Sequence, residues 1–89
     1  MVTVEFRVNS IQGLHARPAD LFIHTVNQFS SEIRIKNLTT GSDFVNAKST
    51  LRVLSLGVYH GHIIQIQAEG TDEMQAIEGI SALVKTNFL

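Results

Sequence analysis

Three segments of the chain alternate apolar and polar residues with a period of two. Their apolar members are Val2, Val4, Phe6, Val8, Ile33, Ile35, Ile64 and Ile66. Such alternation predicts β-strands that bury one face, and we place them at residues 2–8, 32–36 and 62–68. A turn at residues 38–42 separates the second strand from a short third strand at residues 43–45, so these two are predicted to form a hairpin.

Two other segments repeat apolar residues at the spacing of a helix. Their apolar members are Ala19, Phe22, Ile23, Val26 and Phe29 in the first and Met74, Ala76, Ile77, Ile80, Leu83 and Val84 in the second. This spacing predicts one amphipathic helix at residues 16–29 and another that starts near Asp72, which with Gln75 resembles a capping box. A shorter helix is expected at residues 49–56, with Gly57 as its left-handed cap.

The predicted elements follow the order βαββαβα. Strands with one apolar face need a cover, and amphipathic helices need a sheet against which to bury their apolar stripe. We therefore predict an α+β fold, an open-faced sandwich in which a four-stranded, largely antiparallel sheet carries the helices on one face. The 89 residues suffice for a single domain, residues 1–89, with one modest hydrophobic core.

Composition excludes several classes of function. The net charge of −1 provides no basic field to hold nucleic acid or an anionic membrane, and the strands lack aromatic residues at alternating positions suited to base stacking. The chain has no cysteine, which excludes disulfides and thiolate metal sites. Its first residues do not resemble a secretory signal, and no run approaches the ~20 apolar residues of a membrane span. We expect a soluble intracellular protein without membrane insertion.

The most informative chemistry lies in Gly13–Ala19, with the sequence Gly-Leu-His-Ala-Arg-Pro-Ala. Pro18 marks the first turn of a helix, because its φ is helical and it lacks the N–H that a first turn leaves unpaired. His15 is therefore expected at the helix N-terminus, where backbone N–H groups and the helix dipole favour anions. Imidazole is a nucleophile near neutral pH. We predict that His15 accepts a phosphoryl group, whose oxygens bind the Arg17 guanidinium and the N–H groups of Ala16 and Arg17.

This segment resembles the active-site motif of the HPr family, the histidine phosphocarriers of the bacterial phosphoenolpyruvate:sugar phosphotransferase system. The likeness continues in Asn46–Ser49, Leu54–Gly57 and Ala68–Glu73, in the order of the family, and spans nearly the whole chain. It implies an open-faced sandwich and the phosphorylation of His15 on Nδ1 by phosphorylated enzyme I. The group then passes to enzyme IIA components. The resemblance therefore implies a covalent carrier and not an enzyme, without cofactor or metal, monomeric and cytoplasmic.

Ser49 has two interpretations. Serine suits the N-cap of the short helix. In family members from lineages with an HPr kinase/phosphorylase, this position carries a regulatory phosphate, which a helix N-terminus accommodates. The residues that follow Ser49, Thr50-Leu51-Arg52, depart from the Ser-Ile-Met-Gly pattern of regulated members, and Arg52 is closer to the basic residue of unregulated ones. Both interpretations stay open at this point.

The short helix carries more apolar side chains than it can bury in a small core. One or two of them are expected in the core, and the others suit a surface beside His15 that binds enzyme I and the enzyme IIA components in turn. The predicted docking residues are Leu51, Leu54, Asp20 and Arg52. Asp20 stands where the family usually has a small or neutral residue, so the preferred partner is left open by the sequence.

Three alternatives remain. An acylphosphatase of similar length would need an arginine cradle in a glycine-bearing loop and an asparagine that positions water, whereas this loop delivers His15. His60 and His62 are predicted on one side of a strand and would suit a metal, but the sequence suggests no third ligand. A paralogue that serves a regulatory or nitrogen-linked phosphorelay keeps the fold and the chemistry, and its rates with different forms of enzyme I would distinguish it.

Overall fold

The computed structural model describes the backbone of residues 1–9 and 16–85 and the side chains of residues 1–9 and 19–84. The strands of this part of the chain are β1 (Val2–Arg7), β2 (Glu32–Asn37), β3 (Val45–Asn46) and β4 (Ile63–Glu69). The helices are α1 (Ala16–Val26), α2 (Thr50–Ser55) and α3 (Glu73–Lys85). This order confirms the predicted one. None of the described helices is long and apolar enough to cross a membrane.

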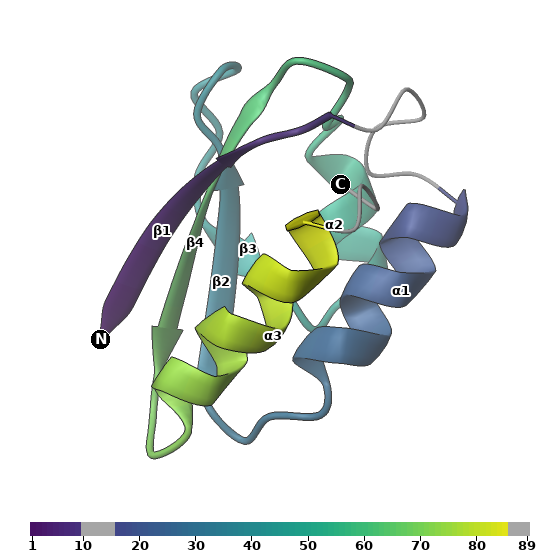
Figure 1. Cartoon of the computed structure of the whole chain (residues 1–89). Helices are drawn as coiled ribbons and strands as arrows, with labels where there is room; N and C mark the ends of the chain where they lie inside the picture. The colour runs from purple at the N-terminus through teal and green to yellow at the C-terminus, as the bar shows by residue number, and fades with distance from the viewer. Residues whose placement is uncertain (10–15, 86–89) are drawn as a thin grey trace.

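The strands form one sheet in the order β1-β4-β2-β3, and each pair of neighbours is antiparallel. Figure 1 shows the helices gathered on one side of this sheet. In the central pair, Ile33 lies opposite Ala68 and Ile35 opposite Ile66, so the apolar residues of the alternating pattern share the face under the helices. The predicted open-faced sandwich is confirmed.

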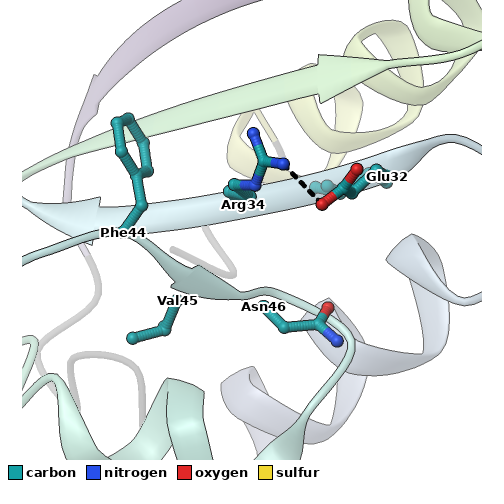
Figure 2. Close-up of a pocket in the computed structure, with 6 residues that line it drawn as sticks. Glu32, Arg34, Phe44, Val45 and Asn46 are labelled. Atoms are coloured by element: carbon teal, nitrogen blue, oxygen red, sulfur yellow. Dashed lines mark hydrogen bonds and ion pairs between the residues drawn. The ribbon is translucent and has the colours of Figure 1, made fainter.

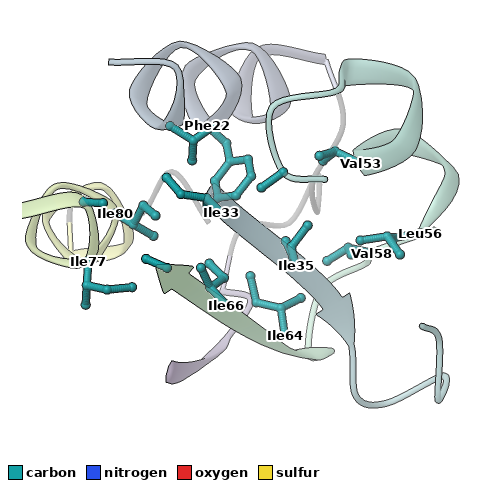
Figure 3. Close-up of a cluster of buried hydrophobic side chains, with 14 of the residues drawn as sticks. Phe22, Ile33, Ile35, Val53, Leu56, Val58, Ile64, Ile66, Ile77 and Ile80 are labelled. Atoms are coloured by element: carbon teal, nitrogen blue, oxygen red, sulfur yellow. The ribbon is translucent and has the colours of Figure 1, made fainter. Parts of the chain in front are cut away.

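The hydrophobic core lies between this face and the helices (Figure 3). Its large, fully buried side chains include Phe22, Val53, Ile33, Ile35, Ile64, Ile66 and Ile80. Each such side chain contributes about 1.5–3 kcal/mol when it is removed from water. Met74 is an exception to the predicted stripe of α3, because it is 57% exposed. The buried residues Ala76, Ile77 and Ile80 define a helix face roughly 120° away from Met74.

The first helix is shorter than the predicted segment 16–29, since α1 ends at Val26. The N–H of Gln28 donates to the C=O of Thr25 at 3.2 Å, and the N–H of Phe29 donates to the C=O of Val26 at 3.3 Å. These bonds span three residues and not four, so the helix closes in a tight turn. Apolar spacing alone continues through this turn, which is why it overestimated the helix.

The third strand also differs from the prediction, because it occupies residues 45–46 instead of 43–45. The hairpin between β2 and β3 is nevertheless present. The N–H of Asn37 donates to the hydroxyl of Ser42 at 2.8 Å, and the N–H of Ser42 donates to the C=O of Asn37 at 3.1 Å. These bonds keep the chain in a turn through Ser42, so the pairing of β3 with β2 begins later in the chain than predicted.

The start of α3 is attached to the start of β2 through the carboxylate of Asp72. This carboxylate accepts the backbone N–H groups of Ser30 (2.8 Å) and Ser31 (2.9 Å) and both serine hydroxyls. The predicted capping box with Gln75 is therefore wrong, although the C=O of Asp72 accepts the N–H of Ala76. The four bonds, that from the Ser31 hydroxyl above all, lower the pKa of Asp72 from 3.8 to about 2.

Gly70 allows these two segments to approach each other. Its φ is +153°, and a Cβ at this position would lie 2.6 Å from the Oγ and 2.8 Å from the Cα of Ser31. Its N–H donates to the carboxylate of Glu73 at 3.2 Å, and this bond lowers the pKa of Glu73. Glycine is the residue that fits both the backbone conformation and the close contact.

Candidate functional site

The predicted phosphoryl acceptor, His15, lies outside the described residues, as do the side chains of Ala16 and Arg17. The backbone shows that α1 begins at Ala16, directly after His15. The predicted start of the first helix is thus confirmed. The N–H groups of a first helical turn have no partner within the helix, and the first turn of α1 contains no acidic residue. The positive end of this helix therefore favours an anion.

The exposed side of α1 carries Asp20 and His24. Asp20 lies one turn after the start of the helix, so its carboxylate is accessible to a protein that approaches this end. His24 lies one turn farther on, and its Nε2 is 3.1 Å from the amide nitrogen of Gln28. Both residues belong to the surface of α1 and not to the core.

Ser49 is the N-cap of α2, as the sequence predicts. Its backbone is extended (φ −97°, ψ 113°), and its Oγ accepts the N–H of Arg52 at 3.4 Å. At the other end of the helix, Gly57 has a φ of +59°, the left-handed conformation predicted for this position. The structural role of Ser49 is therefore confirmed.

α2 exposes two of its leucines. Leu51 is 80% exposed and Leu54 is 38% exposed, whereas Val53 and Leu56 are buried in the core. Arg52 is exposed as well. Since α2 packs against α1, this apolar surface belongs to the same end of the molecule as the first helix (Figure 1). The two leucines thus give α2 an exposed apolar surface.

Lys48 makes a contact with the end of α1 that the sequence did not predict. Its Nζ donates to the C=O of Phe29 at 2.6 Å, just after the end of α1. A cation is favourable at the C-terminal end of a helix, and the bond attaches the residue before Ser49 to α1. The carbonyl that Lys48 binds lies 19 positions away in the chain, so no local pattern predicts this contact. The Asn46–Ser49 motif was the one feature of the sequence that drew attention to Lys48.

His60 and His62 lie in the turn before β4, so their predicted place on one side of a strand is wrong. The Nδ1 of His62 lies 3.0 Å from the amide nitrogen of buried Asn37 and 3.2 Å from the backbone nitrogen of Tyr59. The amide oxygen of Asn37 accepts the N–H groups of residues 39–40, which orients its nitrogen toward His62 as a donor. His62 thus supports the turn. The described residues contain no group of three or more metal-ligating side chains.

A shallow pocket of about 170 Å³ lies between β2 and β3 (Figure 2). It is lined by Glu32, Ile33, Arg34, Phe44, Val45 and Asn46. Figure 2 shows Arg34 turned toward Glu32, and its Nη2 is 2.5 Å from Oε1 of that carboxylate. This pair neutralises the guanidinium. No residue predicted for phosphoryl transfer or docking lines the pocket, so it forms no part of the candidate site.

The fold and the first helix define a class of small open-faced sandwiches in which a histidine directly precedes α1. The chain belongs to the HPr family, since the family model for the PTS HPr component phosphorylation site matches residues 2–86. A phosphocarrier protein HPr from Haemophilus influenzae is 37% identical over 86 residues, which are 97% of this chain and 98% of that protein. The crystal structure of HPr-C-His from Thermoanaerobacter tengcongensis has a TM-score of 0.92 at 40% identity, covering 99% of this chain and 96% of that chain.

Longer relatives contain a similar segment. The multiphosphoryl transfer protein of Vibrio cholerae is 39% identical over 86 residues, which are 97% of this chain. The chain spans only 22% of the length of that relative. The shared segment establishes the family and leaves the activities of the remainder of that protein outside the comparison.

Proposed function

We propose that this chain is a phosphocarrier of the phosphotransferase system, in which His15 takes a phosphoryl group from phosphorylated enzyme I and passes it to an enzyme IIA component. The observation that carries the proposal is the start of α1 at Ala16, directly after His15, in a family defined by a phosphorylation site. Residues 1–89 act as one carrier domain in the cytoplasm. The protein is a covalent carrier and not an enzyme, because it returns to its initial state only after a second protein has accepted the group.

The proposed step exchanges one bond to phosphorus for another. The lone pair of the His15 Nδ1 attacks the phosphorus carried by enzyme I, and the donor atom keeps the electron pair of the bond that breaks. The attack requires an unprotonated Nδ1. Phosphoryl transfer depends mainly on positioning and on stabilisation of charge. The N–H groups of Ala16 and Arg17 and the guanidinium of Arg17 supply both, and no cofactor takes part.

The proposed docking surface for both partners consists of Leu51, Leu54, Asp20 and Arg52. Its support is the exposure of the two leucines on α2, of Arg52 on the same helix and of Asp20 on α1, together with the packing of α1 against α2. A small surface suits a carrier that must bind and release two proteins in turn. The carboxylate of Asp20 favours a partner that presents a basic residue to α1.

Ser49 is proposed as a second phosphate acceptor, for an HPr kinase/phosphorylase. Its hydroxyl is half-buried and accepts the N–H of Arg52, so a phosphate would have to replace this bond. The protein is incubated with such a kinase and ATP, and its mass is then measured. A gain of one phosphate that Ser49→Ala abolishes supports the assignment, and an unchanged mass contradicts it.

The main test incubates the protein with enzyme I, Mg²⁺ and phosphoenolpyruvate and locates the phosphate by mass spectrometry. We expect one acid-labile phosphate on His15 and no charging of His15→Ala. His24→Ala is the matched control, because His24 is exposed on the same helix, and it should be charged at the rate of the unmodified protein. Charging of His15→Ala at that rate would overturn the proposal. Faster charging by a nitrogen-linked enzyme I would assign the chain to the alternative phosphorelay.

A further inference from the structure

The pocket between β2 and β3 opens on the face of the sheet opposite the helices. Glu32 and Arg34 lie on this face, because they alternate along β2 with Ile33 and Ile35, which are buried under the helices. Asn46 shares the face, since it pairs directly with Arg34 across the two strands. Figure 1 shows α1, α2 and α3 on the other side of the sheet. The pocket is therefore separate from the proposed site of phosphoryl transfer and from the leucines of α2.

The pair formed by Glu32 and Arg34 keeps hydrogen-bonding capacity for a ligand. The Nη2 of Arg34 donates to the Oε1 of Glu32 at 2.5 Å, and within residues 1–9 and 19–84 neither side chain makes another hydrogen bond. A guanidinium has five N–H donors, and a carboxylate has about four acceptor positions. The two side chains are 39% and 61% exposed, so the remaining donors and acceptors are accessible.

Asn46 adds a second donor beside the guanidinium. Its Oδ1 accepts the N–H of Lys48 at 2.9 Å, so its Nδ2 is the atom left for another partner. No side chain in the described part of the chain accepts a hydrogen bond from this nitrogen. The pocket thus presents the donors of Arg34 and Asn46 next to the acceptor of Glu32.

The charges of the pair select the class of ligand. A simple anion that is attracted by Arg34 is repelled by Glu32, and a simple cation meets the reverse situation. A ligand that carries both charges and is neutral as a whole is attracted by both residues. Because Nη2 and Oε1 lie 2.5 Å apart, the two charges of the ligand must also lie close together. An α-amino acid meets this requirement, since one carbon atom joins its ammonium and its carboxylate.

Phe44 provides an apolar wall of the pocket. Its side chain is half-buried, and the Nζ of Lys36 lies 4.6 Å from the centroid of its ring, a cation–π contact that holds the ring in place. Figure 2 shows the ring standing beside Arg34. The volume of about 170 Å³ is smaller than the roughly 300–1,000 Å³ of pockets that hold drug-sized ligands. The pocket therefore suits a small ligand with an apolar group next to its charges.

We propose that this pocket binds a free α-amino acid with an apolar side chain. The carboxylate of the ligand accepts hydrogen bonds from Arg34 and from the Nδ2 of Asn46, its ammonium donates to Glu32, and its side chain packs against the ring of Phe44. The ligand binds without covalent chemistry and is independent of the proposed carrier cycle. Because the contact is small and partly exposed, the dissociation constant should be about 1 mM.

Titration of the isotope-labelled full chain with L-leucine, followed by NMR, tests this proposal. We expect saturable shifts of the backbone amides of residues 32–36 and 44–46, with a dissociation constant of about 1 mM. Glycine has no apolar side chain to place against Phe44, so it should bind roughly fivefold more weakly or worse. The absence of saturable shifts up to about 50 mM leucine, or an equal affinity for glycine, overturns the proposal.

Two derivatives of leucine test the assignment of its charges. Leucinamide lacks the carboxylate and N-acetylleucine lacks the ammonium, so each should bind about tenfold more weakly than leucine. Arg34→Gln should weaken the binding of leucine by a similar factor but should not weaken that of leucinamide, which has no carboxylate to lose a partner. Glu32→Gln should in the same way not weaken N-acetylleucine. A further loss for either derivative with its variant contradicts the assigned contacts.

Arg7→Gln is the matched control. Arg7 is an exposed arginine on the same face of the sheet, in β1, which β4 separates from β2. Its substitution should leave the dissociation constant of leucine unchanged, and a loss as large as that of Arg34→Gln would overturn the assigned site. Circular dichroism checks that every variant is folded. Charging by enzyme I is measured separately and without leucine, so a failure of the carrier function and a failure of this inference are distinguishable.

Discussion

The helices α1 and α3 begin in opposite electrostatic settings. α3 follows Asp72 and starts with Glu73, and both carboxylates accept backbone N–H groups of neighbouring segments. α1 has no acidic residue in its first turn and carries Arg17 there. Because the N-terminus of a helix favours negative charge, α3 is complemented by carboxylates of the chain itself. The first turn of α1 has no carboxylate of its own to offset the positive end of that helix.

This difference shows how one fold uses the same physical feature for stability and for function. The carboxylates of Asp72 and Glu73 place negative charge at the start of α3, and that of Asp72 also holds Ser30 and Ser31, just before β2. Negative charge that belongs to the chain itself disfavours a bound anion at this helix start. The proposed carrier needs a site that is filled and emptied in every cycle, and such a site requires a helix start without a carboxylate of its own.

Substitution of Arg17 should have the largest effect. Arg17→Ala removes the guanidinium proposed to bind the phosphate and should slow charging by enzyme I roughly 10²-fold, as when one preorganised donor is lost, with an unchanged melting temperature. Rapid-quench kinetics measures the rate. Arg34→Ala is the control, because Arg34 is paired with Glu32 on β2. Charging of Arg17→Ala at the unmodified rate would refute the proposed role.

At the other helix start, Gly70→Ala should reduce the free energy of unfolding by about 2–3 kcal/mol. The added Cβ would lie 2.6 Å from the Oγ of Ser31 and disturb the contact that holds Asp72. Gly41→Ala is the control, because Gly41 also has a positive φ (+73°) but a Cβ there would meet no atom within 4 Å, so about 1 kcal/mol is expected. Denaturant unfolding measures both. Equal losses would show that close contact at Gly70 contributes nothing.

The pH dependence of stability tests the same contact without a substitution. The folded pKa of Asp72 is about 2 against an ordinary value of 3.8, so its contribution is complete above pH 3.8 and is lost as the pH falls toward 2. The melting temperature should therefore fall over this range. The Asp72→Asn variant should have a lower melting temperature at neutral pH. Between pH 3.8 and 2, its melting temperature should change less steeply with pH than that of the unmodified protein, and an equally steep change would contradict this account. Glu73, whose pKa is also lowered, contributes to the slope that remains in this variant.

Leu51→Ala should have the smallest effect on stability. Because Leu51 is 80% exposed, the free energy of unfolding should change by less than about 0.5 kcal/mol, while transfer from enzyme I slows if the leucine docks. Val53→Ala, on the buried side of the same helix, should instead cost about 2 kcal/mol. Unfolding and charging measured together separate docking from packing. A large loss of stability in Leu51→Ala would place the leucine in the core.

Much of the fold could be predicted because the relevant signals are local. Period-two alternation located β1, β2 and β4, and Ser49 and Gly57 marked the two ends of α2. The predictions fail where a residue far away in the chain determines the partner of a side chain. Asp72 has the position of a helix cap, yet its carboxylate bonds to serines 41 and 42 positions away. His62 follows the pattern of a strand, yet its ring supports a turn by accepting a bond from Asn37.

The sequence by itself determined the order of the elements, the apolar faces and the place of His15 directly before a helix, because periodicity, proline and glycine act on their own neighbourhood in the chain. The tertiary structure decided which leucines of α2 face solvent, which carbonyl Lys48 reaches and which strands form the edges of the sheet. These properties depend on contacts that form only when segments far apart in the chain pack together. No local pattern in the sequence specifies which segments those are.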